Sequence, residues 1–149
     1  MSYAVTYPTG GVVVNDRVKT FISTFYAVSD DPSRNDEWVD YFASDASLVV
    51  ADKRASGVAE IRALRKGMWE KIKSRRHKLE KVFPAVFGPP PGNDERGQSE
   101  RLFEYMLYGS VDFETKSGER ATGQWAGRAV LRDGEGGLKY TFYQVYIHT

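Results

Sequence analysis

RLFEYMLYGSVDFETKSGERATGQWAGRAVLRDGEGGLKYTFYQVYI, residues 101–147, is the stretch that decides the fold. Apolar and polar residues alternate through it in three segments, the spacing of half-buried β-strands: 101–113, 120–132 and 138–147. The connectors between them, KSG at 116–118 and DGEGG at 133–137, are short and rich in turn-forming residues. We therefore expect three long strands joined as an antiparallel meander.

The alternation also predicts which side chains of these strands face the core. The inward set is Phe103, Tyr105, Leu107, Gly109 and Val111 from the first strand, Trp125, Gly127, Ala129 and Leu131 from the second, and Tyr140, Phe142, Gln144 and Tyr146 from the third. A β-bulge would exchange the two faces beyond it, because it adds one residue to one strand only.

The first half of the chain is helical in character. Asn15 can cap a helix beginning at Asp16, whose apolar residues recur at three-and-four spacing: Val18, Phe21, Ile22 and Phe25. A shorter helix with Trp38, Val39 and Phe42 follows, and then a brief strand over 47–50. The clearest helix starts near Val58, after Ser56 as a cap, and carries the apolar stripe Ile61, Leu64, Met68 and Ile72.

Size and composition favour one domain spanning residues 1–149. The 21 basic and 20 acidic residues nearly cancel, so no global charge attracts nucleic acid or an anionic membrane. The chain has no cysteine, which excludes disulfides, a thiolate nucleophile and cysteine-ligated zinc. It shows no signal-peptide pattern and no apolar run long enough to span a bilayer, so we expect a cytoplasmic protein.

Two segments have both a functional and a structural interpretation. The Pro/Gly-rich insert 84–99, with PPPG at 89–92, is either a lid over a site or a variable surface loop; loop statistics favour the surface loop. The lysines and arginines between 62 and 81 are either a nucleic-acid patch or a solvated helix face. Aromatic residues do not interleave with these cations for base stacking, so we expect no nucleic-acid partner.

His77 is the leading candidate for chemistry. It is one of two histidines, placed where the helical half gives way to strands, and an unperturbed imidazole titrates near physiological pH. A structural histidine satisfying a backbone carbonyl is the alternative. The sequence has no glycine-rich phosphate loop, no nucleophile-elbow serine and too few histidines for a His-rich metal site. Acid/base chemistry without a cofactor or metal is what remains.

The order of elements resembles the nuclear-transport-factor-two-like superfamily, also called SnoaL-like. Two stretches carry the resemblance, WVDYFASDA at 38–46 and FYQVY at 142–146, and residues 67–77 look similar to fungal SnoaL-like proteins of small-molecule biosynthesis. The resemblance implies an α+β class, with a curved antiparallel sheet wrapped around a long helix as a cystatin-like cone, and two further N-terminal helices. It also implies a deep apolar pocket.

Two members of that superfamily suggest site residues. In scytalone dehydratase, a catalytic histidine corresponds to His77. The rest of its catalytic set departs from this sequence: its tyrosine and aspartate after the first helix fall near Asp30 and Asp31, its first-strand tyrosine near Ala51, and its second histidine near Gln124 or Trp125. The helical tyrosine of ketosteroid isomerase matches Tyr26. The catalytic aspartate of that isomerase falls near Val50, so Asp52 is the closest carboxylate.

These considerations predict catalysis by His77, with Tyr26 as a hydrogen-bond donor and Asp52 as a second base or, alternatively, a surface ion-pair partner. The expected pocket residues are Trp69, Tyr105, Trp125, Phe142, Gln144 and Tyr146. The resemblance implies a cofactor-independent isomerase, cyclase or dehydratase acting on a hydrophobic polyketide or terpenoid intermediate of secondary metabolism. A non-catalytic member that binds a small ligand or a protein is the alternative. Homodimerisation through the open sheet face is expected for both the catalytic and the non-catalytic function.

Overall fold

The computed structural model describes residues 4–7, 11–85 and 102–148. Of the predicted loop at 84–99, only Pro84 and Ala85 are described, and they form the end of a strand, so the insert was predicted to begin too early. The rest of that segment lies outside the described residues, and its role as a lid or a surface loop stays a prediction.

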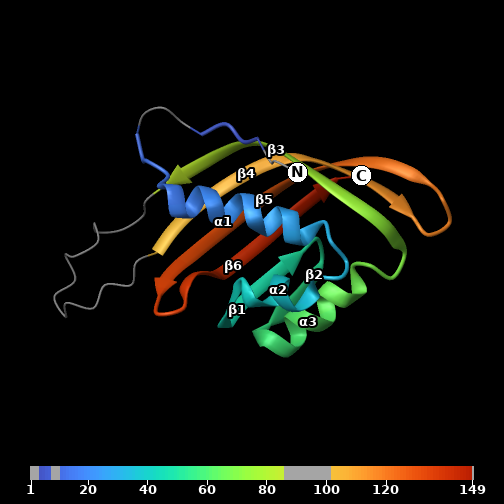
Figure 1. The fold of residues 1–149 in the computed structure, drawn as a ribbon, viewed down its shortest axis with the longest axis horizontal. Helices are drawn as coiled ribbons and strands as arrows, with labels where there is room; N and C mark the ends of the chain where they lie inside the picture. The colour runs from blue at the N-terminus through green and yellow to red at the C-terminus, as the bar shows by residue number, and fades with distance from the viewer. Residues whose placement is uncertain (1–3, 8–10, 86–101, 149) are drawn as a thin grey trace.

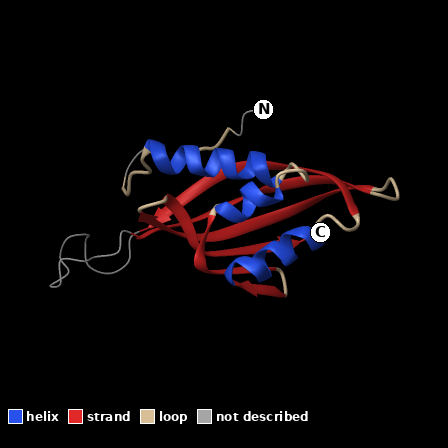
Figure 2. Ribbon diagram, turned by 60° about the horizontal axis from the view of Figure 1, so that its bottom comes forward, coloured by secondary structure: helices blue, strands red, loops and turns tan. Residues whose placement is uncertain are grey.

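Three helices and six strands make up the described fold. In chain order they are α1 Asp16–Ser29, α2 Asn35–Asp40, β1 Phe42–Val50, β2 Lys53–Ser56, α3 Gly57–Gly67, β3 Ile72–Ala85, β4 Leu102–Thr115, β5 Arg120–Gly134 and β6 Gly137–His148. Figure 1 shows α1 lying over the long strands, with α2 and α3 near β1 and β2. Figure 2 shows how the long strands curve beneath α1.

The strands form one sheet in the order β2-β1-β6-β5-β4-β3. All neighbours are antiparallel except β1 and β6, which are parallel. The predicted meander of β4, β5 and β6 is confirmed, as is the α+β class with a curved, mostly antiparallel sheet. The helix lying across this sheet is α1, however, and not the helix after Val58 that was predicted to be the clearest.

Helix α1 forms as its sequence predicts. The Asn15 side chain accepts a hydrogen bond from the backbone N–H of Val18 at 3.0 Å, which satisfies one of the free donors of the first turn. Phe25 packs edge-on against Tyr140 and Tyr143 of β6, at ring distances of 4.8 and 5.6 Å. The core is therefore an aromatic layer between α1 and the sheet.

Helix α3 is shorter than predicted. It ends at Gly67, and Ile72, expected on its apolar stripe, is the first residue of β3. Within β3, the side chains of Arg75, His77 and Leu79 turn toward the helices, and the strand pairs with β4 along its length. This pairing overrides the helical spacing of the local sequence. His77 consequently lies within a strand and not at the seam between a helix and a strand.

A bulge in β6 changes its predicted faces. Leu131 pairs with Tyr140 but Val130 pairs with Phe142, so Thr141 is an extra residue. Beyond it, Tyr143 is buried under α1. The assignment of Phe142, Gln144 and Tyr146 to the inner face is therefore wrong, and these three side chains lie on the face away from the helices.

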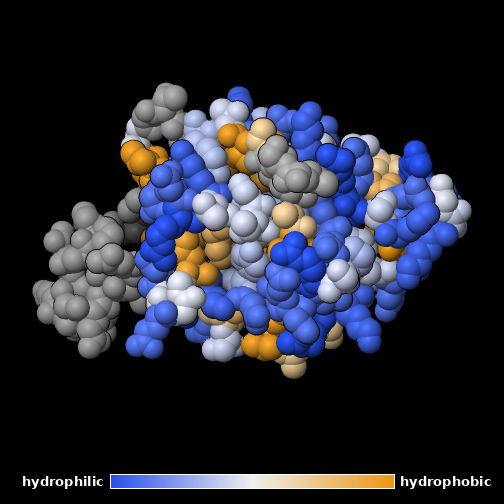
Figure 3. Space-filling model, in the orientation of Figure 1, coloured by the Kyte–Doolittle hydropathy of each residue, from blue (hydrophilic) through white to orange (hydrophobic). Residues whose placement is uncertain are grey.

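The surface on the helix side is mostly polar. Figure 3 shows hydrophobic side chains there only as small patches among hydrophilic ones, consistent with helices that bury their apolar faces. None of the helices in the described ranges is long and apolar enough to cross a membrane.

Candidate active site

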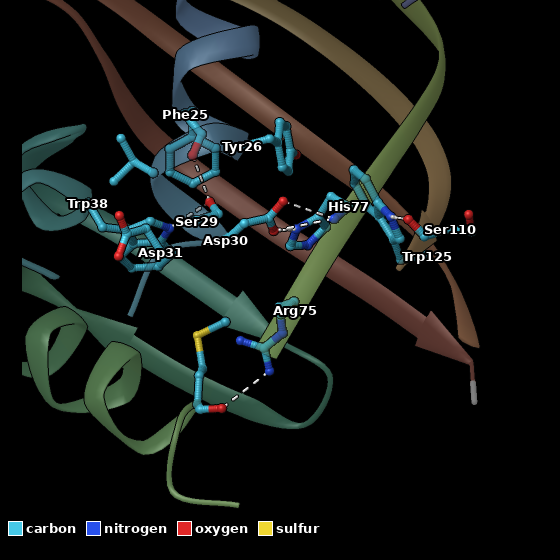
Figure 4. A network of polar contacts seen from close by, with 12 residues as sticks. Phe25, Tyr26, Ser29, Asp30, Asp31, Trp38, Arg75, His77, Ser110 and Trp125 are labelled. Carbon is cyan, nitrogen blue, oxygen red and sulfur yellow. Dashed lines mark hydrogen bonds and ion pairs between the residues drawn. The ribbon is translucent and has the colours of Figure 1, made fainter. Parts of the chain in front are cut away.

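An aspartate and a histidine from distant parts of the chain meet at the centre of this site. Asp30 is the C-cap residue of α1, and His77 faces it from β3. His77 Nδ1 lies 2.5 Å from Asp30 Oδ1, and the His77 backbone N–H donates to Asp30 Oδ2 at 3.1 Å. Figure 4 shows the carboxylate reaching across to the histidine. The two contacts fix both the ring and the strand that carries it.

This arrangement leaves one ring nitrogen of the histidine able to accept a proton. A carboxylate accepts hydrogen bonds, so Nδ1 carries the proton and Nε2 is the ring nitrogen able to take one up. Only 15% of the His77 side chain and 8% of the Asp30 side chain are exposed. The low exposure strengthens the electrostatic support that Asp30 gives to a protonated imidazole ring.

Two predicted site residues enclose the imidazole ring. The rings of Tyr26 and Trp125 lie 5.3 and 5.4 Å from that of His77. A hydrogen bond from Trp125 Nε1 to the Ser110 carbonyl fixes the position of the Trp125 ring. The Tyr26 hydroxyl is bonded to that of Tyr143 at 2.6 Å. Burial raises the pKa of Tyr26 well above its ordinary value, so its hydroxyl stays protonated.

Arg65 holds the turn that carries Asp30. Its side chain is fully buried, and its donors reach acceptors on both sides of Asp30: the carbonyls of Val28, Ser29 and Asp31, and the side-chain oxygen of Asn35. Carbonyls at a helix C-terminus lack helical partners and carry partial negative charge, so a cation is stabilised there. Burial still lowers the pKa of Arg65, to about 10. The prediction of a solvated basic face is wrong for this residue.

Replacing Arg65 by methionine removes its donors from these four acceptors, of which the Val28 and Ser29 carbonyls are bonded at buried contacts and the other two at partly buried ones. We expect the free energy of unfolding to fall by about 3 kcal/mol or more, measured by urea denaturation. The matched control is Arg62→Met on the same helix, because Arg62 is half-exposed and its one ion pair among the described residues is with Asp36. Its expected cost is less than about 1 kcal/mol. Equal losses in the two variants would show that Arg65 does not hold the turn.

A cleft of about 870 Å³ opens beside Asp30. Its lining residues are Asp30, Ser74, Arg75, Arg76, Asp112, Phe113, Glu114, Arg120, Ala121 and Thr122. It is thus more polar than the aromatic pocket predicted from the sequence. Trp125 and Tyr146, two of the predicted pocket residues, line a different cleft of about 440 Å³ that also contains His148.

The remaining predicted residues do not gather around His77. Asp52 lies exposed in the turn between β1 and β2, at the opposite end of the strand order from β3. Trp69 lies beside the guanidinium groups of Arg65 and Arg75, and Tyr105 is a buried core residue. In the part of the chain that the structure describes, no three His, Asp or Glu side chains group as metal ligands.

The sequence prediction missed Asp30 as the partner of His77. The one signal for it was the superfamily resemblance, which placed a catalytic aspartate near Asp30 and Asp31. The residues themselves gave no sign that positions 30 and 77 meet, because 46 residues separate them and the contact depends on how α1 crosses the sheet.

The chain matches no family model and no curated protein sequence. Among solved structures, it is similar to a proposed scytalone dehydratase from Novosphingobium aromaticivorans, with a TM-score of 0.70 and 10% identity over 89% of this chain and 83% of that one. It is also similar to a hexachlorocyclohexane dehydrochlorinase of type 2, with a TM-score of 0.72 and 7% identity over 89% of this chain and 84% of that one.

A proposed aromatic ring hydroxylase, also from N. aromaticivorans, gives a TM-score of 0.71 and 20% identity, covering 90% of both chains. Several further matches are described as nuclear-transport-factor-two-like, one of them with a cystatin-like fold. At these identities the likeness establishes the fold alone, and the varied activities in the names agree with a fold that hosts different reactions.

Proposed function

We propose that this protein is a cofactor-independent dehydratase or isomerase in which His77 is the general base and Asp30 orients it. The observation that carries the proposal is the double contact of one carboxylate with the ring and the backbone of His77. A dehydratase and a dehydrochlorinase among the structural neighbours, both eliminating enzymes by name, agree with this class of chemistry.

The reaction begins with removal of an acidic C–H proton, such as one next to a carbonyl group, by His77 Nε2. The electron pair of that bond moves into the substrate as an enolate, while Asp30 stabilises the imidazolium that forms. An isomerase then returns the proton to a different carbon. A dehydratase instead gives it to a departing hydroxyl group, and water leaves as a new double bond forms.

We propose a hydrophobic substrate, of polyketide or terpenoid type, from secondary metabolism. The aromatic surroundings of the base support an unsaturated or ring-containing substrate, because the buried rings of Tyr26 and Trp125 lie 5.3 and 5.4 Å from the imidazole ring. A cyclase uses the same enolate and remains part of the proposal. Non-catalytic ligand binding is the competing function.

Proton exchange on a simple ketone tests the catalytic step without knowledge of the natural substrate. 2-Tetralone, a two-ring ketone with acidic α-protons, is incubated with the protein in D₂O, and loss of the α-proton signals is followed by ¹H NMR. The proposal requires faster exchange with the protein than in buffer with the same concentration of free imidazole. A rate no higher than that control would favour the ligand-binding alternative.

We also propose a homodimer formed through the sheet face away from the helices. Large apolar side chains are exposed on this outer face: Phe83, Leu102, Met106, Tyr108 and Tyr146. Phe83 and Tyr108 stack at 6.0 Å and line an apolar cleft of about 530 Å³ with Met106. A contiguous apolar surface of this kind is typical of an interaction site, and a second copy of the chain supplies a matching face.

The dimer prediction is tested by sedimentation of the wild type and of Met106→Lys. We expect twice the monomer mass for the wild type and the monomer mass for the variant, because a buried unpaired lysine opposes association. Val58→Lys is the control, since Val58 is similarly exposed but lies on α3. A wild-type protein that sediments as a monomer at all concentrations would exclude the dimer.

A further inference from the structure

Arg75 is a cation at the site that the proposed reaction does not use. It lies on β3 two residues before His77, so the two side chains share one face of the strand. Its guanidinium lies 4.8 Å from the Trp69 ring, and its Nη2 donates to the Met68 carbonyl at 3.2 Å. Figure 4 shows it extending from β3 on the same side as the Asp30–His77 pair.

The second terminal nitrogen of this guanidinium is poorly satisfied. Nη1 is buried and has no hydrogen-bond partner among the described residues. A buried cationic donor without an acceptor is costly, and an arginine fork is suited to binding a planar oxyanion. Arg75 also lines the 870 Å³ cleft together with Asp30.

The charged groups around Arg75 allow an anion to bind it, because the neighbouring carboxylates already have partners. Asp30 attracts the Arg75 guanidinium, but the Asp30 carboxylate is already engaged by the ring and backbone of His77. Arg65 packs against the same Trp69 ring at 5.1 Å and repels Arg75. Of the other carboxylates that line the cleft, Asp112 accepts a hydrogen bond from Thr122, and Glu114 is paired with Lys73 and Arg120.

We propose that Arg75 binds a carboxylate of the ligand, so that the substrate is a hydrophobic carboxylic acid with its reacting carbon held toward His77. The inference rests on the proposed function only in naming this ligand as the substrate. Phe113 and Ala121 in the cleft wall give its carbon skeleton apolar surface. Arg75 is therefore a residue that sets specificity, while His77 performs the chemistry.

Binding of two matched probes tests this assignment. 2-Naphthoate carries a carboxylate on a two-ring skeleton, and 2-naphthalenemethanol is its uncharged counterpart; both are titrated by calorimetry. The wild type should bind naphthoate at least about tenfold more tightly than the alcohol, the effect of a charge-assisted hydrogen bond. Arg75→Gln should remove this preference, and Arg75→Lys should retain part of it because the charge remains.

Two control variants separate a specific contact from general charge. Arg54→Gln removes one exposed positive charge on β2, and Arg76→Gln removes one from the same cleft at the next residue of β3. Both should keep the preference for naphthoate. Equal wild-type affinity for the two probes, unchanged preference in Arg75→Gln, or an equal loss in Arg76→Gln would overturn the assignment. The wild-type comparison holds even if Arg75→Gln fails to fold.

This outcome is distinguishable from failure of the proposed function. If 2-tetralone exchange fails but naphthoate binding depends on Arg75, the protein is a binder of hydrophobic acids and the carboxylate contact stands. If exchange succeeds but naphthoate binding is independent of Arg75, the catalytic proposal stands and this inference alone is overturned.

Discussion

His77→Gln is expected to reduce the exchange of 2-tetralone α-protons by about 10²–10⁴-fold, the usual contribution of a positioned general base. Glutamine keeps much of the side-chain length and polarity but has no nitrogen that takes up a proton near neutral pH. His148→Gln is the matched control, because it removes the chain's other histidine from the exposed end of β6. Equal loss in both variants, or no loss in either, would exclude His77 as the base.

Asp30→Asn separates orientation from proton uptake. Asparagine has nearly the same shape as aspartate, but it lacks the charge that stabilises the imidazolium and favours the Nδ1–H tautomer. Exchange should fall by about 10²-fold or more. The ¹H–¹⁵N spectrum of His77 should change from the single Nδ1–H tautomer to a mixture. Asp31→Asn is the control, because Asp31 bonds to Ser33 instead. An unchanged His77 spectrum in Asp30→Asn would show that Asp30 does not set the tautomer.

The parts of the fold predicted correctly from the sequence are those with strong local signals. The apolar spacing and the Asn15 cap specify α1, and alternation specifies β4 and β5, because each pattern directly reflects which face is buried. The inner face of β6 was predicted wrongly because the bulge at Thr141 exists only through pairing with β5. No local sequence pattern predicts an extra residue at this position.

The candidate site was predicted in part for a similar reason. His77 was found by residue type, and Tyr26 and Trp125 by resemblance and by strand parity. Asp30 and Arg65 were missed in their actual roles, since an aspartate after a helix and an arginine on one are ordinary surface residues in most proteins. Their importance arises from the long-range contacts of Asp30 with His77 and of Arg65 with the end of α1.

Gly109→Ala is expected to destabilise the protein more than any surface substitution. Gly109 pairs with Leu79 of β3 next to a shift in register, where the extra residue is Glu80. A Cβ atom at position 109 would lie 1.9 Å from the carbonyl oxygen of Lys78 and 3.2 Å from the Cα of Leu79. Both atoms belong to the backbone, so no side-chain rotation relieves the clash, and β3 must move away from β4.

We expect this variant to lose about 3 kcal/mol or more of unfolding free energy, measured in urea, or to fail to fold. Gly67→Ala is the control: a Cβ there meets nothing within 4 Å, and alanine favours the last residue of α3 by up to about 1 kcal/mol. Similar stability of the two variants would mean that the strands do not approach so closely. If Gly109→Ala folds, moving β3 should separate His77 from Asp30, so exchange should fall even in the folded fraction. The close approach at Gly109 thus helps to hold His77 against Asp30 as well as to hold the sheet together.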